Sequence, residues 1–483
     1  MARDDKSLVV SGFLWRFFER IAAQVVSFIV STLLARLLLP EEYGTIALVN
    51  IFITLANVFV TSGFGNALVQ KKDADDADFS SVFYFNVLLS LVLYAILFFC
   101  SPLIASIYDE PKLTLVCRVM GLRLIIAAVN TIQHAYVSRH MLFRRFFWST
   151  LGGTLLSGVV GIAMAYYGLG IWALVAQYMV NVATDTVVLF FTVKWRPKLL
   201  FSWQKLKGLI SYGWKLLASE LVNTGYMELR SLIIGVKYSS ADLAYYNRGQ
   251  SFPKLFVVNV NSAIQSTLFP VLSKAQDDRE RLRGMARRAI RISSYIVLPL
   301  TIGLALTAKP FISVLLTDRW LECVPFLQMY CVFYGLMPMQ SANLQVIKAI
   351  GRTDVYLKLE IVKKLVGTLL LLASMPFGVY VIAAGAVASN VFAVLINTVA
   401  NKKLLDYGLW AQLKDLFNGI LPLLVMSAAV YAVGLVAMPN LLLLFAQVAV
   451  GGVTYVLASW ALKNESFVYL LNFAKQFLRK KKK

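Results

Sequence analysis

The sequence predicts an all-α polytopic membrane protein, and three properties of the chain lead to this fold class. Of its 483 residues, 59% are hydrophobic and 15% are charged, with a mean hydropathy of +0.70, which lies outside the range of soluble globular proteins. The apolar residues form unbroken runs of roughly 20 residues, the length of one helical crossing. Since hydrocarbon offers the backbone no hydrogen-bond partners, such runs predict helices, whereas a barrel would show short alternating segments.

We predict fourteen transmembrane helices. In chain order they lie near residues 14–39, 44–66, 81–102, 115–137, 149–167, 172–193, 209–236, 247–270, 292–316, 324–347, 357–375, 379–400, 417–437 and 441–462. An even number of spans places both termini on one side of the membrane. No hydrophilic loop exceeds about 20 residues, so the chain has no room for a soluble catalytic or nucleotide-binding domain.

The distribution of Lys and Arg predicts the orientation. Basic residues gather on the side of the termini, in the loops near 67–80, 138–148, 194–208, 271–291, 348–358 and 401–416 and in the tail from Lys463. The opposite side holds only Lys112, Lys237 and Arg319. By the positive-inside rule, both termini of this multi-pass membrane protein are predicted to be cytoplasmic.

An internal repeat predicts the domain organisation. A shift of 199 residues aligns Trp15 and Arg16 with Trp214 and Lys215, and the following polar positions also coincide. Parallel repeats of this kind are typical of transporters. We therefore predict an N-terminal lobe of helices 1–6, a C-terminal lobe of helices 7–12, two extra helices and a basic cytoplasmic tail, at residues 1–198, 199–416, 417–462 and 463–483.

Polar side chains form stripes at helical spacing on several predicted spans. The candidate substrate-binding residues of these stripes are Arg16, Arg20, Gln24, Lys215, Asn223, Tyr226, Arg230, Arg248, Lys363 and Lys364. The acidic residues that offer possible sites for a coupling ion are Glu19, Asp185, Glu220, Glu228 and Glu360. For any single residue, hydrogen bonding between helices is an equal alternative to a ligand role.

The spans contain more basic than acidic residues, so pairing within the membrane leaves an excess of positive charge. A Lys or Arg near the bilayer centre costs about 2.5–3.5 kcal/mol on the insertion scale, so aligned cations indicate water, counter-ions or an anionic ligand. We infer a cationic, hydrated cleft between the two lobes, in which Arg16 and Lys215 form an inner phosphate gate. With two histidines and no P-loop, the chain is predicted to hold no metal and no cofactor and to use no ATP itself.

Three segments carry a family resemblance. ARLLLPEEYG after helix 1, SGFGNALVQKKD after helix 2 and VFYFN at the start of helix 3 resemble the polysaccharide-exporter branch of the multidrug/oligosaccharidyl-lipid/polysaccharide (MOP) flippase superfamily, the Wzx-type proteins that include colanic-acid exporters. The resemblance implies a two-lobed bundle that alternates access. It also implies that undecaprenyl-diphosphate-linked oligosaccharide moves from the cytoplasmic to the periplasmic leaflet for surface polysaccharide (lipopolysaccharide or exopolysaccharide) biosynthesis.

Three classes of function remain to be compared. We favour the flippase, with lipid-linked oligosaccharide, membrane lipid, a coupling ion (H⁺ or Na⁺) and polysaccharide polymerase or export machinery as partners, and no nucleic acid. A multidrug or cation antiporter of the same superfamily would be expected to have twelve spans and an acidic cleft. A polymerase or ligase would need a large outer loop with catalytic groups, so we predict that the protein is not an enzyme.

Overall fold

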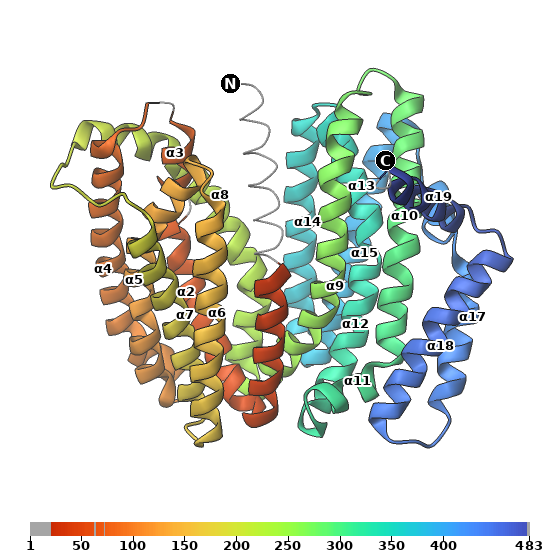
Figure 1. Ribbon diagram of the computed structural model, residues 1–483, viewed down its shortest axis with the longest axis horizontal. Helices are drawn as coiled ribbons and strands as arrows, with labels where there is room; N and C mark the ends of the chain where they lie inside the picture. Colours follow the sequence, from red (N-terminus) through yellow and green to blue (C-terminus); the bar gives the residue numbers. More distant parts are fainter. Residues whose placement is uncertain (1–20, 62–63, 72, 481–483) are drawn as a thin grey trace. The chain divides into compact units, whose positions relative to one another are not determined.

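The computed structural model describes residues 21–480 apart from residues 62, 63 and 72. All regular secondary structure among these residues is helical, which confirms the predicted fold class. Contacts between the helices divide the chain into two compact units, unit 1 at Met1–Ala244 and unit 2 at Tyr245–Lys483. Along the colour scale of Figure 1, unit 1 runs from red to yellow-green and unit 2 from green to blue.

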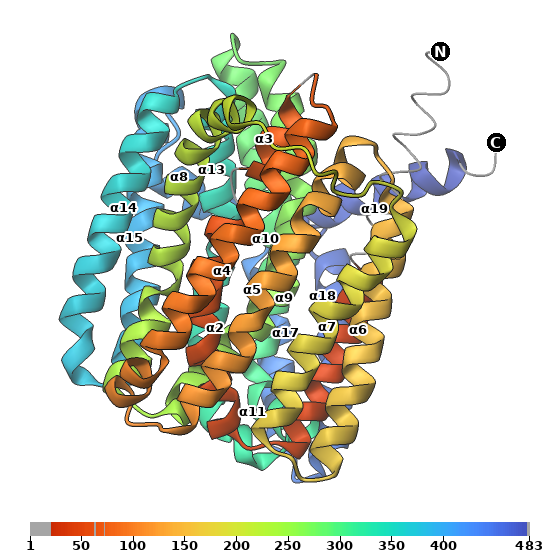
Figure 2. The same ribbon diagram turned by 90° about the vertical axis from the view of Figure 1, so that its left-hand side faces the viewer.

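Unit 1 is built from long helices joined by short turns. After a helix at Ile21–Leu37 its elements are α2 (Pro40–Thr61), α3 (Phe64–Gln70), α4 (Asp76–Ile107), α5 (Lys112–Arg139), α6 (Phe143–Tyr166), α7 (Ile171–Thr192) and α8 (Trp203–Lys237). Neighbours in sequence pack side by side, α4 against α5 and α6 against α7 (Figure 2). The repeat assigned α8 to the second lobe, whereas α8 packs against α2, α3 and α4. The boundary at residues 198 and 199 stays a prediction.

Unit 2 is also built from helices and contains the C-terminal part of the chain. Its elements are α9 (Ser240–Ser273, which begins in unit 1), α10 (Arg279–Leu306), α11 (Ala308–Leu315), η1 (Asp318–Cys323), α12 (Val324–Gly335), α13 (Met337–Ala349), α14 (Thr353–Ser374), η2 (Met375–Phe377), α15 (Val379–Leu405), α16 (Leu409–Leu416), α17 (Ile420–Gly434), α18 (Asn440–Ala461) and α19 (Glu465–Lys480). The helices α17 and α18 form a packed pair.

Each of the fourteen predicted spans falls on a helix or on a broken helix, although the first one is described only from Ile21. Ten of the described helices are long and apolar enough to cross a bilayer, or eleven when α16 and α17 count as one span bent by 50°. The helices α8 and α14 miss this threshold because they carry the polar and charged residues of the predicted stripes. Most of the predicted basic tail lies in the helix α19.

Proline explains the two breaks within predicted spans. The span predicted at 324–347 is divided between α12 and α13, and Pro338 occupies the first turn of α13. The span predicted at 292–316 ends as α10 before the short helix α11, whose first turn contains Pro310. Proline lacks the N–H needed for a continuous helix, but it is tolerated in the first turn, where that donor has no partner.

Gly44 permits a close approach between the first turns of α2 and α9. A Cβ atom on Gly44 would lie 1.7 Å from the carbonyl oxygen of Ser240, so only glycine fits this contact. The helix α2 begins at Pro40 and α9 begins at Ser240. The contact therefore joins the N-terminal ends of two helices within unit 1.

We predict that Gly44→Ala destabilises the protein by about 1–3 kcal/mol, because the added methyl group forces backbone atoms apart. Gly152→Ala on α6 is the matched control, since a Cβ there meets no atom within 4 Å. Thermal unfolding in detergent should show a lower transition for Gly44→Ala and an unchanged or higher one for Gly152→Ala. Equal transitions for the two variants would contradict the close approach.

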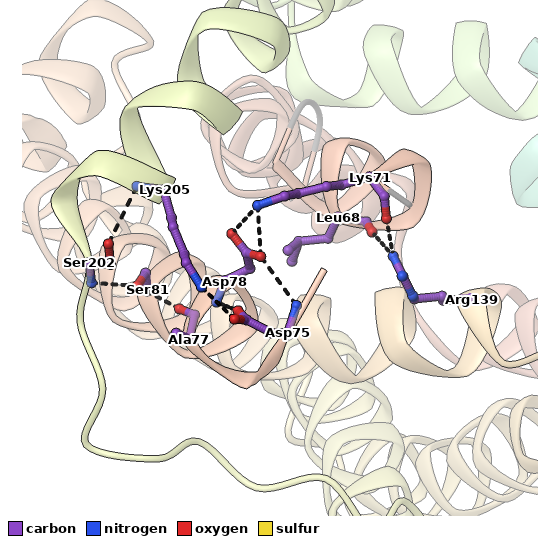
Figure 3. A network of polar contacts seen from close by, with 9 residues as sticks. All are labelled: Leu68, Lys71, Asp75, Ala77, Asp78, Ser81, Arg139, Ser202 and Lys205. Carbon is purple, nitrogen blue, oxygen red and sulfur yellow. Dashed lines mark hydrogen bonds and ion pairs between the residues drawn. The ribbon is translucent and has the colours of Figure 1, made fainter. Parts of the chain in front are cut away.

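A polar network closes one end of unit 1 (Figure 3). The buried carboxylate of Asp78 accepts hydrogen bonds from Lys71 Nζ at 2.7 and 2.8 Å and from the backbone N–H of Asp75 at 3.2 Å. Asp75 caps α4 by accepting from the N–H of Asp78 at 3.0 Å, and it pairs with Lys205. Arg139 Nη1 donates to the carbonyl oxygens of Leu68 and Lys71. The loops predicted at 67–80, 138–148 and 194–208 to share a side therefore meet at one end.

The ion pair with Lys205 lowers the pKa of the Asp75 carboxyl to about 2. The pKa of an Asp carboxyl in the unfolded chain is about 4, so the lower pKa in the folded state means that Asp75 stabilises folding when the pH is above about 4. The contribution is lost as the pH falls through about 2. The pair is exposed, so its contribution is small.

Asp78→Asn is expected to destabilise unit 1 by about 1–3 kcal/mol, because it removes a buried acceptor of charged hydrogen bonds. Asp76→Asn is the control, because the side chain of Asp76 is 45% exposed and that of its partner Lys198 is 59% exposed. Exposed ion pairs contribute about 0–1 kcal/mol to stability. Unfolding of the purified variants should separate the two. A result in which Asp76→Asn costs as much as Asp78→Asn would show that burial does not set the strength of the network.

Unit 2 has a corresponding network, built on arginines of α10. Asp415 is fully buried and accepts from Arg287 Nε at 2.8 Å and from Arg291 Nε at 2.6 Å. Tyr407 Oη donates to the same carboxylate at 2.7 Å. Arg291 Nη1 also donates to Glu465 of α19 at 2.7 Å. The predicted loops 271–291 and 401–416 and the C-terminal tail are thereby joined at one end of unit 2.

Candidate functional site

The predicted stripe on the first helix is described only in part. Arg16, Glu19 and Arg20 lie outside the described residues, so the inner gate stays a prediction. Gln24 is half-buried on the helix at Ile21–Leu37 and makes polar contacts there.

The predicted stripe on α8 is exposed toward the start of the helix and half-buried toward its end. Arg230 lies with its guanidinium carbon 5.9 Å from the ring centroid of Tyr226, one turn earlier. The Nε atom of Arg230 is buried and has no hydrogen-bond partner among the described residues. Asn223 and Glu228 are also half-buried. The structure thus brings a cation and an aromatic ring together, as the helical spacing predicted.

Lys215 and Glu220, nearer the start of α8, are exposed. Glu220 accepts a hydrogen bond from Thr224 at 3.4 Å, within the same helix. The side chain of Glu220 therefore contacts a residue of its own helix.

The predicted residues of unit 2 fall into two groups. Arg248 on α9 lies with its guanidinium carbon 5.4 Å from the ring of Trp320. Lys363 on α14 pairs with Glu360 at 2.5 Å, and its side chain is 11% exposed. Lys364 is half-buried beside them. The pair of Lys363 and Glu360 is a salt bridge within one helix, whereas the alternative weighed for these residues was hydrogen bonding between helices.

Sequence reasoning missed Arg123, a half-buried arginine within α5 of unit 1. Arg123 on α5 donates from Nη1 to Asn50 Oδ1 of α2 at 2.9 Å, and its guanidinium carbon lies 4.8 Å from the ring of Tyr178 on α7. On the same helix Arg118 lies 4.2 Å from the ring of Phe98. The signal was present, because both arginines interrupt an apolar run, but neither belongs to a stripe of polar residues.

Asp185 on α7 is a predicted acidic residue with two side-chain partners on another helix, α5. Asn130 Nδ2 donates to Asp185 Oδ2 at 2.5 Å, and His134 Nε2 lies 3.0 Å from the same oxygen. The His134 ring stacks on Phe146 of α6, with 4.7 Å between centroids. Asp185 is thus the hydrogen-bond partner of His134. Asn130 was missed, although it precedes His134 by one helical turn.

A cavity of about 430 Å³ lies beside this cluster, with Asn130 and His134 in its wall together with Thr61, Thr131 and Ser138. A cavity with several polar walls can hold water. In the described part of the chain, the Oδ1 atoms of Asp185 and Asn130 are buried without a hydrogen-bond partner. The cluster therefore has spare acceptors next to a space that water can enter.

The arginines within the spans of unit 1 share one electrostatic property. The contacts that hold Arg118, Arg123 and Arg230 are to aromatic rings and to neutral oxygen atoms. Such partners orient a guanidinium without cancelling its charge. No cluster of three or more His, Cys, Asp or Glu side chains that could hold a metal ion occurs among the residues that the structure describes.

The fold is similar to that of solved membrane transporters. The lipid II flippase MurJ in an inward closed conformation matches with a TM-score of 0.73 and 16% identity, over 93% of this chain and 98% of that one. A multidrug resistance MATE family transporter of the MOP superfamily, in an inward-facing conformation, matches with a TM-score of 0.59 and 16% identity, over 79% and 94% of the two chains. At these identities the likeness concerns the fold.

Sequence comparisons give relatives that cover most of the chain. The teichuronic acid biosynthesis protein TuaB of Bacillus subtilis is 23% identical over 87% of both chains. The succinoglycan biosynthesis transport protein ExoT of Rhizobium meliloti is 24% identical over 70% of this chain and 68% of its own. The lipopolysaccharide biosynthesis protein WzxC of Escherichia coli is 24% identical over 73% and 72%. A model of the family described as polysaccharide biosynthesis protein matches residues 33–325. The chain therefore belongs to the polysaccharide biosynthesis protein family, which confirms the resemblance predicted from its motifs.

Proposed function

We propose that the protein is a flippase that moves undecaprenyl-diphosphate-linked oligosaccharide from the cytoplasmic to the periplasmic leaflet of a bacterial inner membrane. A cationic central cleft binds the diphosphate and alternates its access between the two sides. The oligosaccharide then enters surface polysaccharide synthesis.

The intramembrane arginines with neutral partners carry this proposal. Arg123 is held at the middle of α5 by Asn50 and Tyr178, so its positive charge stays available to an anion. Arginine matches phosphate oxygens with paired N–H donors. A charge of this kind in hydrocarbon is costly and marks a substrate pathway by default. The positive charge of Arg123 would repel the cationic drugs that an antiporter of this superfamily carries.

The relatives support the substrate class. ExoT is named as a succinoglycan transport protein, and TuaB and WzxC are named for the biosynthesis of teichuronic acid and lipopolysaccharide. These are different glycans, so the shared part of the substrates is their carrier. Recognition of a lipid diphosphate by arginines, with the glycan accommodated in water, fits this diversity.

Deletion of the gene in the native host should cause polyprenyl-diphosphate oligosaccharide to accumulate in lipid extracts, since synthesis continues without export. Wild-type protein should restore surface glycan. Arg123→Gln should lower export at least about tenfold, because one lost charge-assisted contact is worth about 1.5–3 kcal/mol. Mass spectrometry of the lipids and staining of surface glycan are the measurements.

The control is Arg352→Gln, which removes an exposed arginine paired with Asp354 at 2.9 Å and should restore export fully. Equal membrane abundance of both variants is checked by immunoblot. Normal lipids together with drug sensitivity in the deletion strain would favour the antiporter. Full export by Arg123→Gln would remove the observation on which the proposal rests.

We propose further that transport is coupled to protons at the cluster of Asn130, His134 and Asp185. His134 and Asp185 share a hydrogen bond and can exchange one proton between them. The neighbouring cavity gives this proton access to water. Ionisable groups placed inside membrane helices commonly serve as proton relays.

Asp185→Asn should abolish proton coupling, because an amide keeps the shape of the cluster but cannot ionise. Wild-type export is expected to fall when a protonophore collapses the pH gradient and to persist when a sodium ionophore is added. Glu322→Gln is the control, since Glu322 is an acceptor for Tyr380 in unit 2 and lies outside the cluster. Normal, protonophore-sensitive export by Asp185→Asn would place the coupling site elsewhere, and loss under the sodium ionophore alone would replace H⁺ by Na⁺.

A further inference from the structure

Three arginines of α10 line a cavity next to the C-terminal helix. The cavity measures about 320 Å³, and its walls include Arg287, Arg288 and Arg291 of α10 and Glu465 and Tyr469 of α19. The helix α19 lies across the axis of α10 (Figure 1). We call this cavity the arginine pocket. It belongs to unit 2 alone and takes no part in the proposed cleft.

The arginine pocket has hydrogen-bond donors to spare. Arg287 uses two of its five N–H groups on Asp415, and Arg291 uses one on Asp415 and one on Glu465. Arg288 is exposed and lies 5.8 Å from the ring of Tyr469, and none of the ion pairs formed by described residues includes it. The buried Asp415 therefore fixes two of the guanidinium groups beside the third.

An apolar groove continues from the arginine pocket along the same face of α10. The groove measures about 750 Å³ and is lined by α10, α17, α18 and α19, among others. On α10 the pocket residues 284, 287, 288, 291 and 292 are followed by the groove residues 295, 296, 299, 300, 303 and 304, and the groove continues to Thr307 directly after the helix. Successive residues of this series are alternately three and one positions apart, so they lie on one face of the helix. A charged head and an apolar chain could therefore be held by one continuous surface.

The pocket lies at the border of the hydrocarbon layer. From Ile292 to Leu306 α10 contains no charged residue, a stretch of about 22 Å at 1.5 Å per residue. Arg291 directly precedes it. The helix α19 is amphipathic, with exposed apolar residues such as Tyr469 and Leu471, and helices of this kind lie in the headgroup region.

We propose that the arginine pocket binds the phosphodiester of an anionic phospholipid of the surrounding membrane, with an acyl chain in the apolar groove. Charge selects this ligand. Three arginines face two carboxylates, Asp415 and Glu465, so the local excess is one positive charge, which a phosphodiester neutralises and a diphosphate exceeds. The bound lipid would fasten α19 to α10. This inference holds whether or not the chain transports a glycan, because no residue of the proposed cleft takes part.

The test uses the full-length protein in detergent, with lipid binding measured by native mass spectrometry. The probes are phosphatidylglycerol, zwitterionic phosphatidylcholine, undecaprenyl diphosphate and inorganic phosphate. Phosphatidylglycerol should bind the wild type more tightly than the other three. Arg288→Gln should lower its affinity about tenfold, the lower end for the loss of a charge-assisted contact, and Arg288→Lys should lose less.

The matched control is Arg283→Gln, which removes the same charge from α10 at a residue outside the pocket wall, and its affinity should stay within about twofold of the wild type. Because Arg288 forms no bond to Asp415, the variant should fold, which gel filtration verifies. Equal binding of phosphatidylglycerol and phosphatidylcholine, or equal affinity of Arg288→Gln and wild type, would overturn the proposal. Tightest binding by undecaprenyl diphosphate would assign the pocket to substrate, and equal binding by inorganic phosphate would leave only an unspecific anion site; either outcome also overturns it.

Discussion

The bilayer interior offers polar groups no water, and the placement of charge in this protein follows from that constraint. Backbone groups are satisfied by helices. Side-chain charges are either collected at the ends of the helices or held within the spans by specific partners. The cost of a buried charge is large enough that each such partner has structural or functional meaning.

At the helix ends, buried carboxylates organise the loops. Asp78 in unit 1 holds Lys71, and Asp415 in unit 2 holds Arg287 and Arg291. Both carboxylates are fully buried and receive several donors, which offsets their loss of hydration. The two networks join loops that are far apart in sequence, so they fix the ends of the long helices without a large soluble domain.

Within the spans the arrangement is different. Arg123 contacts an amide and a tyrosine ring, and Arg230 contacts a tyrosine ring. The Oδ2 atom of Asp185 lies 3.0 Å from His134 Nε2, and none of the ion pairs formed by described residues joins Asp185 to a Lys or Arg. Under the proposed function, charges held in this way respond to an anionic substrate or to protons. The networks at the ends of each unit join loops, whereas these groups inside unit 1 carry the proposed transport.

The sequence by itself determined the helices, since hydrophobic length depends only on local composition, and each predicted span falls on a helix. It also determined the family, through the motifs near residues 35–44 and 62–73. Only the tertiary structure showed that His134 and Asp185 meet, because they lie on different helices 51 residues apart. It likewise decided that the three arginines of α10 line a pocket beside α19, with an apolar groove on the same face of α10. Periodicity gives the face of a helix on which a residue lies, whereas the partner on that face depends on which helices pack together, and this is a property of the folded chain.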